Sequence, residues 1–229
     1  MTIHFRHFRH FRHFRHFRAL SVTLVATLVG ATTLAGNALA QANTVKAGVI
    51  YYQTHARTTG ITGIGVPAGA DAQVGNAATV LLSFERELAP NLGIELVLGW
   101  PPTIKAKGAG SVPFLGEVLT AKNIAPTLLV NYHFGDRAAR WRPYLGLGIN
   151  YTYFADAKTP YGWDVNLSSS WGLAAQAGID VAIDKQWGLF ASIAKVQVKS
   201  DLVAIGAAVL QTTIDFRPVT YAAGVSYKF

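Results

Sequence analysis

The sequence predicts an all-β fold, an eight-stranded antiparallel transmembrane β-barrel, and three observations support this prediction. The chain of 229 residues is 51% hydrophobic but only 14% charged, whereas soluble domains carry about 25% charged residues. No run of about 20 apolar residues follows residue 40, so membrane-spanning helices are not expected there. Hydrophobic residues instead alternate with small or polar ones, which is typical of strands with one face in lipid.

The first 40 residues predict an export signal. Residues 4–18 are five copies of His-Phe-Arg, Ala19–Ala35 is apolar, and Ala38-Leu39-Ala40 has the A-x-A pattern of a cleavage site. These are the three parts of a secretory signal peptide, although an uncleaved membrane anchor is an alternative. The His and Arg side chains of the repeat could also bind metal ions or anions. We therefore assign 1–40 to a signal peptide and 41–229 to one outer-membrane barrel domain.

The net charge of +8 belongs mostly to this leader. Five of the 20 basic residues lie in the repeat, and the other 15 stand against 12 acidic residues, so residues 41–229 carry only +3. Nucleic acid is therefore not an expected partner. The absence of cysteine excludes a disulfide framework and a thiolate metal site. No glycine-rich phosphate-binding loop follows a predicted strand.

Eight segments show the alternation of a barrel strand. The clearest begins at Trp171, where large apolar residues on one face oppose Gln176 and Asp180 on the other. The first segment is the least clear. An even number of strands lets the sheet close, so that no edge is left unpaired in lipid. The predicted strands are Val45–Thr54, Val80–Glu85, Ile94–Trp100, Thr127–Phe134, Tyr144–Phe154, Trp171–Ile183, Trp187–Ala194 and Tyr221–Phe229.

The connections between these strands alternate in length. Short polar links are expected at Ala89–Asn91, Gly135–Trp141 and Asp184–Lys185, and long loops at 56–76, 106–117, 156–170 and 200–211. Short periplasmic turns and long external loops are the usual asymmetry of such barrels. Aromatic residues near the strand ends suit girdles at the two membrane interfaces. They are Trp100, Tyr132, Phe134, Tyr151, Tyr153, Trp171, Trp187, Tyr227 and Phe229.

An eight-stranded barrel is only wide enough to be filled by side chains or to hold one small ligand. The charges expected to face inward, including Glu85 and Lys228, must be paired or wet. The apolar residues expected to face inward have two possible interpretations: they form an ordinary packed core, or they line a path for an apolar solute. The predicted channel-lining residues are Leu81, Glu95, Val97, Leu129, Asn131, Gly146, Gly148, Asn150, Gln176, Asp180, Phe190 and Ser192.

Four motifs, in order along the chain, resemble the outer membrane protein W (OmpW) family. Residues 126–134 (PTLLVNYHF) resemble the family's PPTLLLQYHF strand, and residues 142–154 (RPYLGLGINYTYF) its RPYVGAGVNYTxF segment. Residues 170–180 (SWGLAAQAGID) match SWGxAxQxGxD, and residues 224–229 (GVSYKF) match the closing strand. Together these motifs are specific, and the resemblance spans essentially all of residues 41–229.

The resemblance implies a narrow, largely hydrophobic channel for passive passage of small apolar molecules across the cell outer membrane. It also implies contact with the lipid bilayer and lipopolysaccharide, and recognition of the strand ending at Phe229 by the barrel-assembly machinery. Two departures stand out. Phe190 and Ser192 replace the family's inward Asn and Asp, and a bulge is predicted at residues 215–218 (DFRP), the counterpart of the family's DxxP pattern.

Two other classes of function remain as alternatives. A structural or receptor barrel would present its loops, above all 56–76, to a partner. A lipid-modifying enzyme would need a nucleophile, a base and an acid at one membrane face, and His55, Asp71 and Ser111 are the candidates. Their spacing does not join them, and His133 is interpreted as structural. With two histidines beyond the leader and no cysteine, we expect no catalytic, cofactor or dedicated zinc site.

The favoured hypothesis is a passive conduit. A small hydrophobic solute would enter between the external loops and descend along the lumen residues. It would leave sideways through a gap in the wall, or downward past Leu129 and Asn131.

Overall fold

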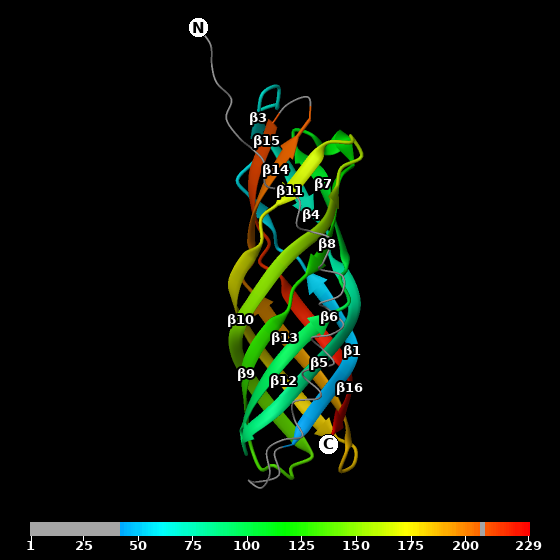
Figure 1. The fold of residues 1–229 in the computed structure, drawn as a ribbon, viewed down its shortest axis with the longest axis vertical. Helices are drawn as coiled ribbons and strands as arrows, with labels where there is room; N and C mark the ends of the chain where they lie inside the picture. The colour runs from blue at the N-terminus through cyan, green and yellow to red at the C-terminus, as the bar shows by residue number, and fades with distance from the viewer. Residues whose placement is uncertain (1–41, 207–208) are drawn as a thin grey trace, which may run out of the picture. The chain divides into compact units, whose positions relative to one another are not determined.

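The eight predicted strands close into one antiparallel barrel. The computed structural model describes residues 42–206 and 209–229, and the predicted signal peptide lies outside these residues. Each barrel strand pairs with the previous and the next one, and the last pairs with the first (Figure 1). The strands are β1 (Asn43–Gln53), β5 (Ala77–Ala89), β6 (Leu92–Gly99), β9 (Thr127–His133), β10 (Trp141–Lys158), β12 (Ser170–Ala182), β13 (Trp187–Val196) and β16 (Val219–Lys228).

The closing pair leaves no free edge in the barrel wall. Strand β1 pairs with β16 from Thr44 to Gln53 and, on its other side, with β5 from Asn43 to Tyr52. Because each of the eight barrel strands is hydrogen-bonded to two neighbours, its backbone polar groups are satisfied without water. The predicted fold is therefore confirmed, although the first strand begins two residues earlier than the sequence suggested.

The long connections were predicted as loops, and this was wrong for about half of their length. In and beside them, the described part of the chain forms eight further strands that extend the barrel at one end, which we call the loop end (Figure 1). Most of these strands are short, and their large apolar residues are few and mixed with polar ones, so the sequence signal was weak. They are β2 (Arg57–Thr58), β3 (Thr62–Gly63), β4 (Ala70–Val74), β7 (Thr103–Gly110), β8 (Glu117–Ile124), β11 (Asp164–Leu167), β14 (Lys199–Ile205) and β15 (Val209–Asp215); a short 3-10 turn covers Pro113–Leu115.

The opposite end, which we call the turn end, has the three predicted short connections. Gly135 has φ 84°, a left-handed backbone that favours glycine, at the β9–β10 turn. In the β12–β13 turn the Asp184 carboxylate accepts the backbone N–H groups of Trp187 and Gln186, at 2.7 and 2.8 Å. These two hydrogen bonds lower the pKa of Asp184 below its usual value.

The outer face of the barrel is apolar and is bordered by aromatic residues. Leu147 and Leu173 are exposed on the middle of the wall, as expected for side chains that meet lipid. Trp187 packs edge-on against Tyr227 at the turn end, and Tyr151 contacts Trp171 farther along the barrel. Among the described residues, no helix is long and apolar enough to cross a membrane.

Candidate functional site

The barrel interior changes character along its length. Toward the loop end, the barrel strands enclose a cavity of about 90 Å³, which we call the inner cavity. It is lined mainly by apolar side chains such as Ile50, Leu129 and Phe190. A second apolar cavity of about 280 Å³, the outer cavity, lies in the loop-end extension and includes Tyr161 and Trp163. At the turn end a polar hollow of about 500 Å³, the turn-end hollow, opens between the short connections.

The inner cavity follows from the alternation in the barrel strands. Ile50 on β1, Leu81 on β5, Phe190 on β13 and Ala222 on β16 are buried and pack together. They occupy the inward parity of four strands that are neighbours in the closed sheet. The apolar residues on this parity therefore pack as a core and also border open space.

Two phenylalanines separate the inner cavity from the outer one. Phe154 and Phe216 stack with ring centroids 5.3 Å apart, and both are buried. They belong to an apolar cluster that also includes Ile214, which borders the outer cavity, and Val198, which borders the inner cavity. The two cavities share no lining residue, and both rings border the inner one. We call this pair, within the apolar cluster between the two cavities, the constriction.

Unusual backbone flanks the constriction. Asp156 (φ 51°) and Arg217 (φ 41°) are the non-glycine residues with left-handed backbone among residues 42–206 and 209–229. The bulge predicted at 215–218 is not found, because the pairing of β13–β14 with β15–β16 keeps one register on both sides of Arg217. Asp156 instead lies at a register shift between β10 and β8. These kinks lie next to the positions of the two rings.

Toward the turn end the lumen is filled by a charged cluster centred on Lys46, which is 1% exposed. The Lys46 ammonium lies 3.0 Å from Glu85, 3.3 Å from Asp180 and 3.8 Å from Glu95. It also sits over the Tyr144 ring, 4.7 Å from the centroid. We call Lys46, Glu85, Glu95, His133 and Asp180 the Lys46 cluster. Strands β1, β5, β6, β9 and β12 each contribute one member.

Neutral side chains complete the cluster. Glu95 accepts hydrogen bonds from Ser83 at 2.6 Å, Asn131 at 2.8 Å and Gln176 at 2.9 Å. Gln176 also donates to the Asn131 side-chain oxygen at 2.9 Å. Asn131 is 0% exposed, so the predicted downward path past Leu129 and Asn131 is closed. The inner cavity and the turn-end hollow have no lining residue in common, and the cluster forms a septum between them.

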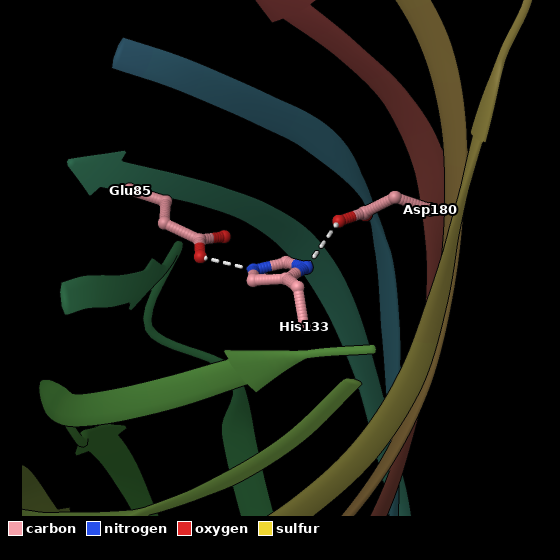
Figure 2. Close-up of side chains that lie close together, drawn as sticks. All are labelled: Glu85, His133 and Asp180. Atoms are coloured by element: carbon pink, nitrogen blue, oxygen red, sulfur yellow. Dashed lines mark hydrogen bonds and ion pairs between the residues drawn. The ribbon is translucent and has the colours of Figure 1, made fainter. Parts of the chain in front are cut away.

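His133 lies between two carboxylates at the turn-end side of the septum (Figure 2). Its Nε2 is 2.6 Å from Glu85 Oε1, and its Nδ1 is 3.6 Å from Asp180 Oδ2. Glu85, His133 and Asp180 all border the turn-end hollow. The structural interpretation of His133 thus gains definite partners, on strands β5 and β12.

Most of the predicted channel-lining residues face the interior. Asn131 is buried in the septum, Asp180 borders the turn-end hollow, and a Cβ on Gly146 would meet the Asn131 side chain. Gly148 is different, because a Cβ there would strike the Leu128 carbonyl, so it permits close strand packing. The eight that border the inner cavity are Leu81, Glu95, Val97, Leu129, Asn150, Gln176, Phe190 and Ser192.

Sequence reasoning missed Lys46. It lies in the first strand, whose alternation is the weakest, and a single Lys there gave no sign of three acidic partners. The candidate catalytic group was not brought together: Asp71 accepts from Thr58 and from the Ala72 N–H. Within the described residues, no hydrogen bond joins His55 to Asp71 or Ser111.

The barrel wall is interrupted beside the inner cavity. The β6–β9 ladder stops at the pair Val97–Thr127. Backbone hydrogen bonding resumes with the Asn123 N–H donating to the Pro102 carbonyl at 3.0 Å, next to the β7–β8 pair Thr103–Lys122. Pro101, Pro102 and Pro126 fall in this interval and have no N–H to donate. Among the described residues, no backbone hydrogen bond joins 98–101 to 124–126. Leu98, Pro102 and Ala125 at the interruption also border the inner cavity.

Comparison with known proteins agrees with this geometry. The model of the OmpW family matches residues 42–229. The chain belongs to the OmpW family. It is 29% identical over 215 residues to outer membrane protein W of Escherichia coli K12, covering 90% of this chain and 98% of that one. The crystal structure of outer membrane protein OprG from Pseudomonas aeruginosa superposes with a TM-score of 0.77 at 25% identity, covering 83% of this chain and 96% of that one.

A third relative is named dibenzothiophene metabolism operon protein PahQ, from Pseudomonas aeruginosa. It is 32% identical over 148 residues, which are 62% of this chain and 65% of that protein. The family members named here include outer-membrane barrels, so this OmpW-family protein is an outer-membrane β-barrel. Its turn end therefore faces the periplasm and its loop end the outside.

Proposed function

We propose that this protein lets small apolar molecules pass the outer membrane passively and releases them sideways into the membrane. The solute would enter at the loop end, occupy the outer cavity and pass the Phe154–Phe216 constriction. It would then reach the inner cavity and leave through the wall interruption near Ala125. No catalytic step and no energy input belong to this proposal.

One observation supports this route above the others: the inner cavity borders the wall interruption, while the Lys46 cluster closes the axis beneath it. An apolar solute gains nothing from displacing a buried ion cluster, whose charges would lose their partners. A solute that passes through the wall interruption does not have to break hydrogen bonds between strands. The lateral alternative is therefore favoured over the axial one.

The lining chemistry suits the same class of solute. The outer cavity is bordered almost entirely by apolar side chains, with Thr159, Gln211 and Thr212 as its polar members. Mostly apolar pockets with few polar groups are the usual sites for small hydrophobic ligands. The name of the relative PahQ refers to dibenzothiophene, and dibenzothiophene is itself a small apolar aromatic compound.

The proposal is tested by uptake into liposomes that carry protein extracted from outer membranes, with lipopolysaccharide in the outer leaflet. A small apolar probe is compared with a sugar of similar size, and the increment over heat-denatured protein is measured. We expect an increment for the apolar probe alone. An increment for the sugar would instead indicate an aqueous pore, and none for either probe would favour the receptor alternative.

Phe190 provides a matched pair of variants. Phe190→Asp places a carboxylate in the inner cavity and should abolish the increment, because an apolar solute would have to pass a hydrated charge. Phe190→Leu keeps the site apolar and should retain it. Both variants must show the heat-dependent gel shift of a folded barrel. Equal uptake by Phe190→Asp and the unchanged protein would rule out this route.

A further inference from the structure

On the periplasmic side of the septum, a ring nitrogen of His133 faces a carboxylate oxygen without a hydrogen bond between them. A carboxylate only accepts hydrogen bonds, so the short contact from His133 Nε2 to Glu85 Oε1, 2.6 Å, places the ring proton on Nε2. Nδ1 lies 3.6 Å from Asp180 Oδ2, and in the neutral ring with this tautomer it presents a lone pair toward that oxygen (Figure 2). Nδ1 is buried and, among the described residues, has no hydrogen-bond partner.

Lys46 does not occupy this position. Its ammonium contacts Glu85 through Oε2 and Asp180 through Oδ1, at 3.0 and 3.3 Å. His133 faces the other oxygen of each carboxylate, Glu85 Oε1 and Asp180 Oδ2. The lysine and the imidazole thus divide the oxygens between them. The space between Nδ1 and Asp180 Oδ2 is left for a different cation.

The charges of the cluster also call for a cation. One ammonium, Lys46, is in contact with three carboxylates, Glu85, Glu95 and Asp180. The single positive charge of Lys46 matches only one of these three carboxylates. Buried charge without a partner is costly, and a doubly charged cation at His133 would balance the cluster.

We propose that His133 Nδ1 and Asp180 Oδ2 bind a divalent transition-metal ion that arrives from the periplasmic hollow. Metal bonds of about 2.0–2.2 Å from an imidazole nitrogen and a carboxylate oxygen are compatible with an N···O separation near the one observed. One ligand atom from each of Glu85, His133 and Asp180 can be chosen so that all lie within 4.8 Å of one another. Glu85 acts as the positioning residue, because its hydrogen bond fixes the ring and its tautomer.

The hollow selects the class of metal. His133 and Asp180 border it, so water can complete the coordination shell. Arg140, Lys185 and Lys228 border it as well, and their positive charges oppose cations that are held by charge alone. A nitrogen ligand favours Cu²⁺ and Zn²⁺ over Mg²⁺ and Ca²⁺. The expected ligand is therefore an imidazole-binding dication.

No local pattern predicted this site, because its residues are far apart in the sequence. Glu85, His133 and Asp180 come from β5, β9 and β12, and only the closed barrel brings them together. The expectation of no dedicated zinc site rested on counting histidines and cysteines. Such a count does not detect a site that is formed by one imidazole and carboxylates.

The test is Cu²⁺ and Zn²⁺ binding by the barrel extracted from outer membranes, with its N-terminus established by mass spectrometry. Calorimetry should give one ion for each barrel, and the Cu²⁺ electron paramagnetic resonance spectrum should show coupling to one imidazole nitrogen. His133→Gln retains a donor toward Glu85 and should abolish this signal. Asp180→Asn should weaken metal binding. Glu85→Gln, which changes the positioning residue, should weaken it by about 10- to 100-fold.

His55 is the matched control, because it is the other histidine of the described residues and is exposed. His55→Gln should bind like the unchanged protein. Nitrogen NMR of His133 in the unchanged protein needs no variant and should show Zn²⁺ shifting Nδ1 rather than Nε2. Absence of binding, unchanged binding by folded His133→Gln, or an imidazole protonated on both nitrogens in the presence of Zn²⁺ would each overturn the proposal.

Discussion

The loop-end and turn-end halves of the lumen are built on the same strands but hold opposite chemistry. In the loop-end half, Phe154, Phe216 and Phe190 border apolar cavities. In the turn-end half, Lys46 and its acidic partners fill the cross-section with charge. The strand alternation is the same in both halves, so alternation sets which side chains point inward and not what the interior can do.

The contrast has a physical reason. A buried charge requires partners at hydrogen-bonding distance, so the Lys46 cluster is tightly connected and excludes other molecules. Apolar side chains have no such requirement, and the space they leave can stay unfilled by water. In a barrel of this width, charged side chains can therefore close one half of the lumen, while the other half can hold apolar solutes.

The largest effect is expected from removing the charge that holds the septum together. Lys46→Met leaves three carboxylates without their ammonium, and it should lower the free energy of unfolding by about 3–5 kcal/mol. Urea unfolding of the barrel in lipid vesicles, followed by tryptophan fluorescence, measures this change.

Lys122→Met is the control, because Lys122 also forms an ion pair, with Asp156 at 2.7 Å, but on an exposed surface. Such a pair contributes about 0–1 kcal/mol. Equal losses for the two variants would show that the septum is no more tightly coupled than a surface pair. The double variant Lys46→Met, Glu85→Gln should regain part of the lost stability. This result would support the view that carboxylates without a counter-charge cause the loss.

The sequence predicted the wall of the barrel far better than its interior partners. Trp171–Ile183 alternates without interruption, and β12 appears there as Ser170–Ala182. Inward positions such as Asp180 follow from the same parity. Which inward residues meet depends on strand register, which the alternation does not fix. Lys46 pairs with acids from three other strands, so no local pattern could reveal it.

The loop-end extension was missed for a different reason. Strand β7, Thr103–Gly110, is rich in Gly, Ala and Lys, so it lacks the large apolar residues that mark the lipid-facing strands. Its pairing with β8 and β4 is a matter of backbone hydrogen bonds, which leave little trace in composition. The constriction shows the consequence, because Phe154 ends a predicted strand whereas its partner Phe216 follows β15, which the sequence did not predict.

A smaller effect is expected at this constriction. Phe154→Leu or Phe216→Leu keeps an apolar side chain but removes the ring stack, which contributes about 0.5–1.5 kcal/mol. The stability loss should be correspondingly small, while uptake of bulkier apolar probes should rise relative to small ones. Phe190→Leu, away from the constriction, should leave that ratio unchanged. A ratio unaffected by both constriction variants would show that the rings do not limit passage.

The wall interruption tests the central claim most directly. Ala125 borders the inner cavity at the interruption, whereas Ala175 is exposed on the outer face of β12. Ala125→Trp should reduce uptake of the apolar probe to the level of heat-denatured protein, because the indole fills the lateral route. Ala175→Trp adds the same ring toward lipid and should leave uptake unchanged. Undiminished uptake by a folded Ala125→Trp barrel would contradict lateral release from the inner cavity.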